Sequence, residues 1–275
     1  MDDSTTYVIG MDLSDRKADL HAARYADGEF WRRGSVALTP AALAEFFGDL
    51  PRSWVVIEIG THSRWVKEAL EEMGHRVTVC NARRLRFIFC GRDKTDQLDA
   101  KALCDVALLR PALLHPVKLR DEAMQRDLAI VRSRDAAVRA RTLLVNNVRG
   151  TVKTLGERIP SCSPDLFAAR TRVAVSTALH EIVEPTLQAI EALSRTIAEL
   201  DARIEALSET DYPETAVLKQ VFGVGPITAL AFVLTLFDPD RFPRNRDVGP
   251  YLGLTPSLLQ SGLWKRATGI SKEGN

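Results

Sequence analysis

Two carboxylates are set in otherwise apolar segments. Asp12 lies in Tyr7-Val-Ile-Gly-Met-Asp-Leu13, and Glu58 lies in Trp54-Val-Val-Ile-Glu-Ile59. An ionised carboxylate in such a segment is costly to bury unless a partner compensates its charge. A metal ion would be one such partner. Hydrogen bonds from backbone amides or from arginine at a strand end would be another, so the residues alone leave both interpretations open.

A second pair of carboxylates, Asp96 and Asp99, follows Arg92 in a segment that predicts the start of a helix. Residues three apart share one helix face, so the two side chains could bind one ion together. The alternative is structural. Asp96 would cap the helix or favour its N-terminal dipole, and Asp99 would be a solvated acid of the first turn.

The elements that must position these carboxylates alternate between strands and helices. Hydropathy and turn residues predict strands at 7–13, 17–25, 29–38, 54–59 and 77–80, and helices at 39–50 and 64–74. Three strands in a meander followed by strand–helix units are typical of an RNase H-like mixed sheet, in which the first strand lies parallel beside the fourth. This α/β order would bring Asp12 near Glu58.

The chain from about Asp121 predicts long helices. Apolar residues at three-four spacing run from Leu128 to Val152 and again from Ile190 to Leu207, which predicts two coiled-coil arms. Pro185 is expected to start or kink the second arm, because proline lacks the amide that a helix interior uses. Turn-forming residues between Gly156 and Pro164 predict a hairpin tip or a short helical insertion.

The remaining segment predicts a mainly helical C-terminal domain. Phe222-Gly-Val-Gly-Pro226 followed by an apolar run resembles the glycine turn and second helix of a helix-hairpin-helix, whose backbone amides can hold a phosphate. A purely structural helix–turn–helix is the alternative, since glycine also permits close packing of helices.

Charge is distributed unevenly along the 275 residues. The net charge is only +1, yet positions 83–158 hold 17 basic residues against 9 acidic ones. A polyanionic partner is expected there, although an arginine-rich solvated helix face would give the same pattern. The absence of an 18-residue apolar run and of a secretory start predicts a cytoplasmic protein that does not enter membranes. The four scattered cysteines are expected to be reduced.

Several motifs in this order carry a resemblance over nearly the whole chain. They are Gly10-Met-Asp12-Leu-Ser, Ile57-Glu58, Lys94-Thr-Asp96-Gln-Leu-Asp99-Ala, Gly223-Val-Gly-Pro and Tyr251-Leu-Gly-Leu-Thr-Pro-Ser-Leu-Leu-Gln-Ser261-Gly. The combination resembles the insertion-sequence one-ten family of DEDD-type transposases. That resemblance implies a RuvC-like domain joined by a coiled coil to a second domain that carries a nucleophilic serine.

The resemblance implies a site made of Asp12, Glu58, Asp96 and Asp99, which would hold one or two Mg²⁺ ions, and of Ser261 as the nucleophile. It also implies partners: DNA of the element ends and of the target, a structured guide RNA, and further copies of the chain as a dimer or tetramer. The residues expected to contact nucleic acid are Arg83, Arg84, Arg86, Arg92, Lys94, Gly223 and Gly225.

The expected domains are a catalytic domain at 5–112, helical arms at 118–210 and a serine domain at 213–275. Similar proteins continue past the equivalent of Asn275, so the last domain is expected to be truncated and strand exchange weakened.

Three other functions are compatible with parts of the sequence. A metal-dependent nuclease would use the same carboxylates with water as the nucleophile. A non-catalytic remnant would only bind nucleic acid. An actin-like ATPase would explain Gly10-Met-Asp12-Leu13, but the later glycine-rich phosphate turns of such proteins are not visible.

Overall fold

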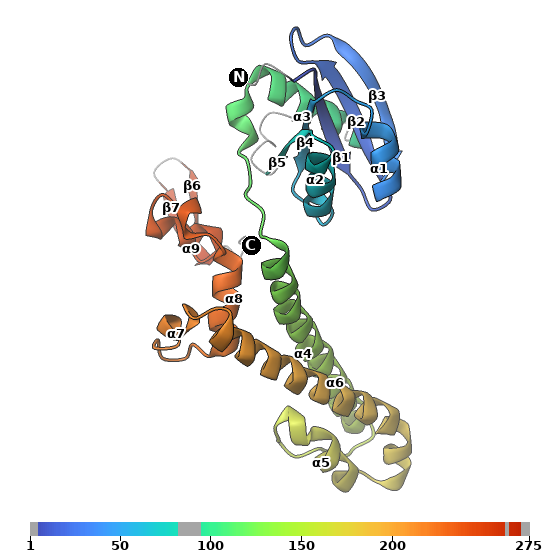
Figure 1. Ribbon diagram of the computed structural model, residues 1–275. Coiled ribbons are helices and arrows are strands. Elements are labelled where there is room, and N and C mark those ends of the chain that lie inside the picture. The colour runs from blue at the N-terminus through green and yellow to red at the C-terminus, as the bar shows by residue number, and fades with distance from the viewer. Residues whose placement is uncertain (1–4, 82–94, 262–263, 271–275) are drawn as a thin grey trace. The chain divides into compact units, whose positions relative to one another are not determined.

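The computed structural model describes residues 5–81, 95–261 and 264–270, of which residues 257–261 and 264–268 are described by their backbone only. Contacts divide the chain into two compact units, Met1–Leu119 and Arg120–Asn275. Figure 1 labels the helices and strands of both units. Within the described ranges no helix is both long enough and apolar enough to cross a lipid bilayer.

The first unit is built on a five-stranded mixed sheet. Its strands are β1 (Tyr7–Leu13), β2 (Lys17–Arg24), β3 (Phe30–Ala37), β4 (Ser53–Glu58) and β5 (Arg76–Cys80). They lie in the order β3-β2-β1-β4-β5, with β1 antiparallel to β2 and parallel to β4. This confirms the predicted RNase H-like sheet, including the parallel pairing of the first and fourth strands.

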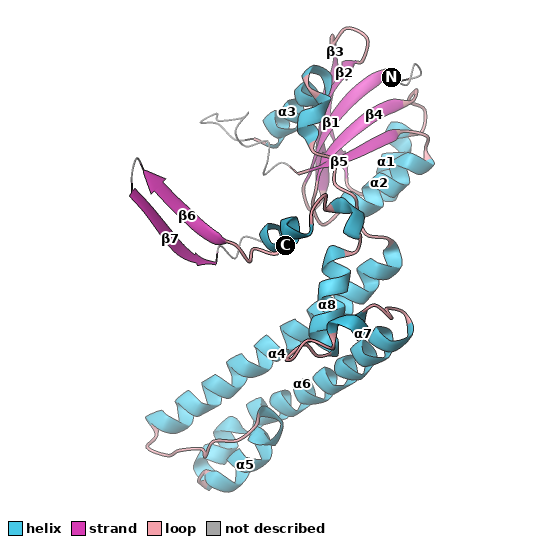
Figure 2. Ribbon diagram, turned by 90° about the vertical axis from the view of Figure 1, so that its left-hand side faces the viewer, coloured by secondary structure: helices cyan, strands magenta, loops and turns pink. Residues whose placement is uncertain are grey.

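Helices cover both faces of this sheet (Figure 2). They are α1 (Pro40–Phe47), α2 (Ser63–Glu72) and α3 (Asp96–Leu109). Alternate strand residues such as Ile9, Val55 and Ile57 pack with the buried side chains of α1 and α2. The intervening residues, such as Val8 and Val56, pack with Leu103 and other side chains of α3. The period-two alternation of the strands therefore produces two cores, one on each face.

Helix α3 approaches β1 unusually closely at Gly10. A Cβ atom placed on Gly10 would lie 2.0 Å from the carbonyl oxygen of Ala100 and 2.6 Å from the amide nitrogen of Cys104. Both neighbours are backbone atoms of α3, so no side-chain rotation could relieve the clash. The contact therefore requires glycine, and it fixes where the helix lies on the sheet.

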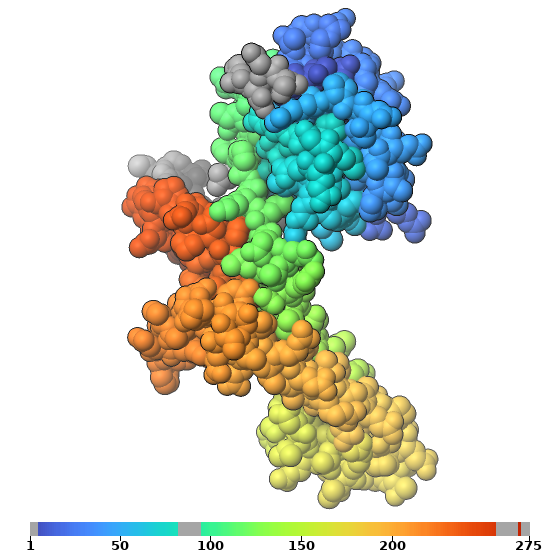
Figure 3. All heavy atoms as spheres, viewed as in Figure 1, coloured from blue at the N-terminus to red at the C-terminus, as the bar shows by residue number. Residues whose placement is uncertain are grey.

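The second unit contains two long helices, α4 (Glu122–Thr154) and α6 (Thr177–Thr210), which pack along each other in opposite directions (Figures 1 and 2). The short helix α5 (Phe167–Ala174) joins them, as the turn-rich segment predicted, and covers one end of the pair (Figure 3). Arg172 of α5 holds this end by ion pairs to Glu184 and Glu191 of α6 at 2.8 and 2.5 Å.

The second arm was expected to start or kink at Pro185, and the start there is wrong, because α6 begins at Thr177 and runs through the proline. Proline removes one backbone hydrogen bond from a helix interior. Val183 and Leu187, on either side, are buried against Val148 and Val152 of α4 and Phe167 of α5. This packing keeps the helix continuous where the local sequence alone would interrupt it.

The chain then forms α7 (Thr215–Leu218), α8 (Pro226–Leu236) and α9 (Val248–Tyr251). Leu230 and Leu234 of α8 pack on Leu128 and Ile204 of the long helices. The final strands, β6 (Pro256–Ser261) and β7 (Trp264–Ile270), form an antiparallel hairpin. The mainly helical domain expected here thus includes a hairpin, whose strands satisfy each other's backbone groups.

The contact at Gly10 predicts that Gly10→Ala is severely destabilising. We expect it to lower the free energy of unfolding by about 3 kcal/mol or more, because overpacking against backbone cannot relax. Gly34→Ala is the matched control, since Gly34 lies in β3 and a Cβ there would have nothing within 4 Å. Urea denaturation of both variants would measure the difference, and equal midpoints would contradict the proposed role of Gly10.

Candidate active site

The first unit brings the four predicted carboxylates to one end of the sheet. Asp12 and Glu58 lie at the carboxyl ends of the parallel neighbours β1 and β4, one residue beyond the paired residues Met11 and Ile57. Asp12 shares the strand face of Gly10, which is the face that α3 covers. The helix therefore places its own first turn near Asp12.

That first turn carries the other two carboxylates. Asp96 is the first residue of α3 and Asp99 lies in its first turn. The helix begins there because the Thr95 hydroxyl accepts a hydrogen bond from the amide of Leu98, which caps the N-terminus. Thr95 thus provides the cap that Asp96 was considered for.

Electrostatics places all four carboxylates in one neighbourhood. Partial burial raises the pKa of Asp12 from its ordinary value to about 6, and repulsion from Asp96, Asp99, Glu58 and Asp19, in that order, adds to the effect. Each neighbour makes ionisation of Asp12 harder because like charges repel. A cation among these side chains would remove that penalty.

A fifth carboxylate, Asp19, belongs to this neighbourhood, and sequence reasoning missed it. Asp19 lies directly opposite Asp12 in the antiparallel pairing of β1 and β2, so both side chains leave the same face. It is only 3% exposed, and Lys17 compensates its charge through an ion pair of 2.7 Å. The polar and apolar alternation of residues 17–25 places Asp19 on one face of its strand. Only the strand register shows that Asp12 lies opposite it.

A pocket of about 330 Å³ lies beside Asp12 and Glu58, and His62 lines it. The indole nitrogen Nε1 of Trp65 donates a hydrogen bond of 3.1 Å to Nδ1 of His62. Because Nδ1 accepts, the neutral ring carries its proton on Nε2, which lies 3.8 Å from Asp15. His62 thus presents a hydrogen-bond donor beside the carboxylates. A single histidine at a helix start carries no signal in the sequence that would distinguish it.

The donor set suits a divalent metal ion in chemical type. All four predicted ligands are carboxylates, and hard cations such as Mg²⁺ prefer oxygen ligands. Burial raises the pKa of Asp12, and repulsion from the neighbouring carboxylates adds to the rise. Over the ranges that the structure describes, however, no three His, Cys, Asp or Glu residues are grouped closely enough to hold one ion. Binding would therefore require side-chain rotation toward the ion.

The other predicted residues belong to the second unit or fall outside the described residues. Ser261 is the last residue of β6, in the second unit, and pairs with Trp264. Gly223 has a φ of +86°, which favours glycine, and Gly225 caps the start of α8. The predicted glycine turn before a helix is therefore present. Five predicted nucleic-acid contacts lie outside the described residues: Arg83, Arg84, Arg86, Arg92 and Lys94.

Comparison with known protein families gives two matches. A DEDD transposase model of the IS110 group, described as "Transposase", matches residues 9–156. A model described as "Transposase IS116/IS110/IS902 family" matches residues 215–275. The first match spans the sheet and α3 together with all four carboxylates, and the second includes Ser261.

Curated proteins similar to this chain are also transposases by name. The "Probable family 20 transposase" of Pseudomonas aeruginosa is 32% identical over 97% of this chain and 79% of its own length. The "Transposase for insertion sequence element IS1328" of Yersinia enterocolitica is 26% identical over 98% of this chain and 79% of its own. The "Transposase for insertion sequence element IS1111A" of Coxiella burnetii is 28% identical over 66% of this chain and 51% of its own.

The raised pKa of Asp12 predicts a specific pH dependence of stability in metal-free buffer. Between about pH 4 and pH 6 the folded state binds the proton more tightly than the unfolded state, so stability falls as pH rises through this window. Asp12→Asn should remove this loss and be more stable at pH 7 by about 1 kcal/mol, after allowance for solvent screening.

Denaturation of wild type and Asp12→Asn at pH 4 and pH 7 would measure this gain, which should shrink at pH 4. Asp49 lies on the exposed turn after α1, so Asp49→Asn is the control for replacing a carboxylate by an amide. A variant at position 12 that is less stable than wild type at pH 7 would show that Asp12 is held by favourable contacts rather than by repulsive ones.

Proposed function

This chain belongs to the IS116/IS110/IS902 family of transposases, and we propose that it cuts and rejoins DNA with the carboxylate cluster of its first unit and the hydroxyl of Ser261. Membership of the family implies DNA cleavage and recombination during transposition. The observation that carries the proposal is the partly buried Asp12, whose ionisation is opposed first by burial and then by the nearby Asp96, Asp99 and Glu58.

The cluster would hold Mg²⁺, with two ions in our proposal, through Asp12, Glu58, Asp96 and Asp99. Such ions polarise the scissile phosphate and stabilise charge on the attacking and leaving oxygens. Asp12 must be ionised to act as a ligand, so its raised pKa predicts binding that strengthens as pH rises through about 6. The Nε2 proton of His62 is placed to donate to a phosphate oxygen in the adjoining pocket.

Ser261 would supply the attacking oxygen. Its Oγ forms a bond to phosphorus while the bond from phosphorus to the DNA leaving oxygen breaks, and the serine proton passes to that oxygen. The resulting phosphoserine ester retains the energy of the phosphodiester bond. A DNA hydroxyl can therefore reverse the reaction and join a new strand without ATP.

Nucleic-acid partners follow from this chemistry. The basic stretch from residue 83 to residue 158 and the glycine turn before α8 would hold DNA and a structured guide RNA. Segments 5–112, 118–210 and 213–275 would serve as catalytic domain, helical arms and serine domain. Exchange of strands needs paired sites, so we infer that the working form is a dimer or tetramer.

The serine mechanism predicts a covalent protein–DNA adduct. Purified protein incubated with labelled element-end DNA, candidate guide RNA and Mg²⁺ should give a band of adduct on a denaturing gel. Ser261→Ala should abolish the adduct, and Asp12→Asn should lower its yield by a factor of about 100 or more because transition-state charge is then poorly stabilised. Ser257→Ala, in the same strand, is the matched control for loss of a hydroxyl.

Other outcomes of this assay identify the competing functions. Cleavage that survives Ser261→Ala without an adduct would establish a nuclease that uses water. Binding that survives chelation, with no cleavage under any divalent metal, would establish a protein that only occupies DNA sites.

The metal proposal predicts stabilisation by divalent cations. Mg²⁺ or Mn²⁺ at about 100 times its dissociation constant should raise the free energy of unfolding by about 2.7 kcal/mol in the wild type. Asp12→Asn and Asp99→Asn should lose most of this gain, whereas Asp49→Asn should keep it. A thermal melt in EDTA against the same melt with metal measures the effect, and an equal rise in all variants would place the binding site elsewhere.

A further inference from the structure

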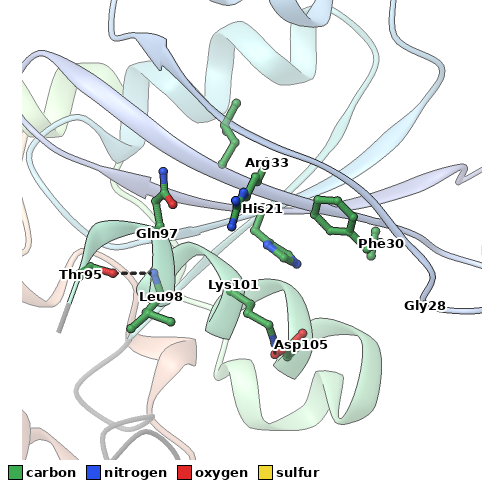
Figure 4. Close-up of a pocket in the computed structure, with 11 residues that line it drawn as sticks. His21, Gly28, Phe30, Arg33, Thr95, Gln97, Leu98, Lys101 and Asp105 are labelled. Atoms are coloured by element: carbon green, nitrogen blue, oxygen red, sulfur yellow. Dashed lines mark hydrogen bonds and ion pairs between the residues drawn. The ribbon is translucent and has the colours of Figure 1, made fainter. Parts of the chain in front are cut away.

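A second and larger pocket lies on the same sheet face as Asp12, between α3 and the strands β2 and β3 (Figure 4). Its volume is about 670 Å³. Rings, cations and polar side chains line it together, and the carboxylates proposed to hold metal do not. The lining residues used below are His21, Phe30, Arg33, Gln97, Lys101 and Asp105.

One wall of the pocket is aromatic. Phe30 begins β3, and its side chain is 55% exposed, so a large apolar ring is open to solvent at this wall. The ring of His21 lies 5.3 Å from it at an interplanar angle of 47°. Burial lowers the pKa of His21, so this ring is neutral at pH 7. The two rings offer an apolar surface of the kind on which a nucleobase stacks.

Charged side chains also line the pocket. Arg33 pairs with His21 across β2 and β3, so its side chain leaves the same face. It forms no ion pair with any residue in the described part of the chain. Lys101 pairs with Asp105 one turn along α3, so these two charges cancel. Among the described residues that line the pocket, Arg33 is thus the cation whose charge no ion pair offsets, which suits a single phosphate.

The pocket is adjacent to the acidic cluster. Asp19 lies opposite Asp12, and His21 follows Asp19 on the same face of β2. Two residues of a strand span about 7 Å, so the pocket begins about that far from the carboxylates. Helix α3 borders both sites, since Asp96 and Asp99 belong to the cluster while Gln97 and Lys101 face the pocket (Figure 4).

We propose that this pocket holds one unpaired nucleotide of the DNA strand that is cut, with its base against Phe30 and His21 and its phosphate beside Arg33. The exposed amide of Gln97 can both donate to and accept from a base edge. DNA is the occupant because the pocket adjoins the carboxylates that act on the scissile strand, and to that extent the proposal rests on the proposed function. Holding a neighbouring nucleotide would fix the scissile phosphate relative to Asp12.

The test uses the full chain in EDTA, so that no cleavage occurs. The probes are single-stranded DNAs of about 12 nucleotides of element-end sequence, each with 2-aminopurine at a different position. We expect position-dependent quenching in the wild type, greatest beside the scissile phosphate. Phe30→Ala should remove the quenching and weaken binding about tenfold, while Phe30→Trp should restore both, because a stacking ring is what position 30 supplies.

Arg33→Ala should weaken binding and reduce its salt dependence, since one phosphate contact is lost. Arg32→Ala is the matched control: Arg32 lies on the same strand but on the other face, 5.0 Å from the ring centroid of Phe46, and should bind as wild type does. Circular dichroism of each variant would show that the sheet is intact.

Two results would overturn the pocket assignment: Phe30→Ala and Arg32→Ala that behave alike, or an RNA of the same sequence that binds while the DNA does not. Failure of the proposed function is a separate outcome. If Asp12→Asn forms the adduct in the same yield as wild type while Phe30-dependent quenching persists, the pocket assignment stands and the carboxylate mechanism is wrong.

Discussion

The contact of α3 with Gly10 is the constraint on which the candidate site depends. Glycine in the middle of a strand costs stability, because it packs no side chain and has more freedom in the unfolded chain. Here it lets the helix backbone come within 2.0 Å of where a Cβ would lie. At a greater separation, Asp96 and Asp99 would stand apart from Asp12, and the four carboxylates would be separate surface acids.

The same closeness has an electrostatic cost. Burial, together with repulsion from neighbouring acids that include two on α3, raises the pKa of Asp12 to about 6, so its ionised form opposes folding at neutral pH in the absence of a cation. Lys17 forms its ion pair with Asp19 and attracts Asp96 and Asp12 more weakly. This end of the sheet thus lowers the stability of the unit, and the two hydrophobic cores on either face of the sheet stabilise the unit. Such a distribution is common where a charged ligand completes a site.

Sequence patterns predicted the sheet and its carboxylates because both depend on local alternation and element order. Asp12 and Glu58 stood out as charges in apolar strands, and the order βββαβαβ placed them side by side. Asp19 was missed because its role depends on the register opposite Asp12, and His62 because its role depends on Trp65. Pro185 was misjudged because packing against α4 outweighs local preference. The structure differs from the sequence predictions at these residues because their roles depend on tertiary contacts, which the sequence of a single segment does not reveal.

The division of chemistry between the units has a consequence for regulation. The four carboxylates of the proposed metal site belong to Met1–Leu119, whereas Ser261 belongs to Arg120–Asn275. In the proposed mechanism neither unit can form the phosphoserine bond alone, because the serine hydroxyl is a weak nucleophile until it is brought beside the metal. Meeting of the two units, within one chain or between copies, would therefore control the reaction. A DNA strand held in the pocket beside α3 would align its phosphate before that meeting, so that substrate binding precedes assembly of the complete site.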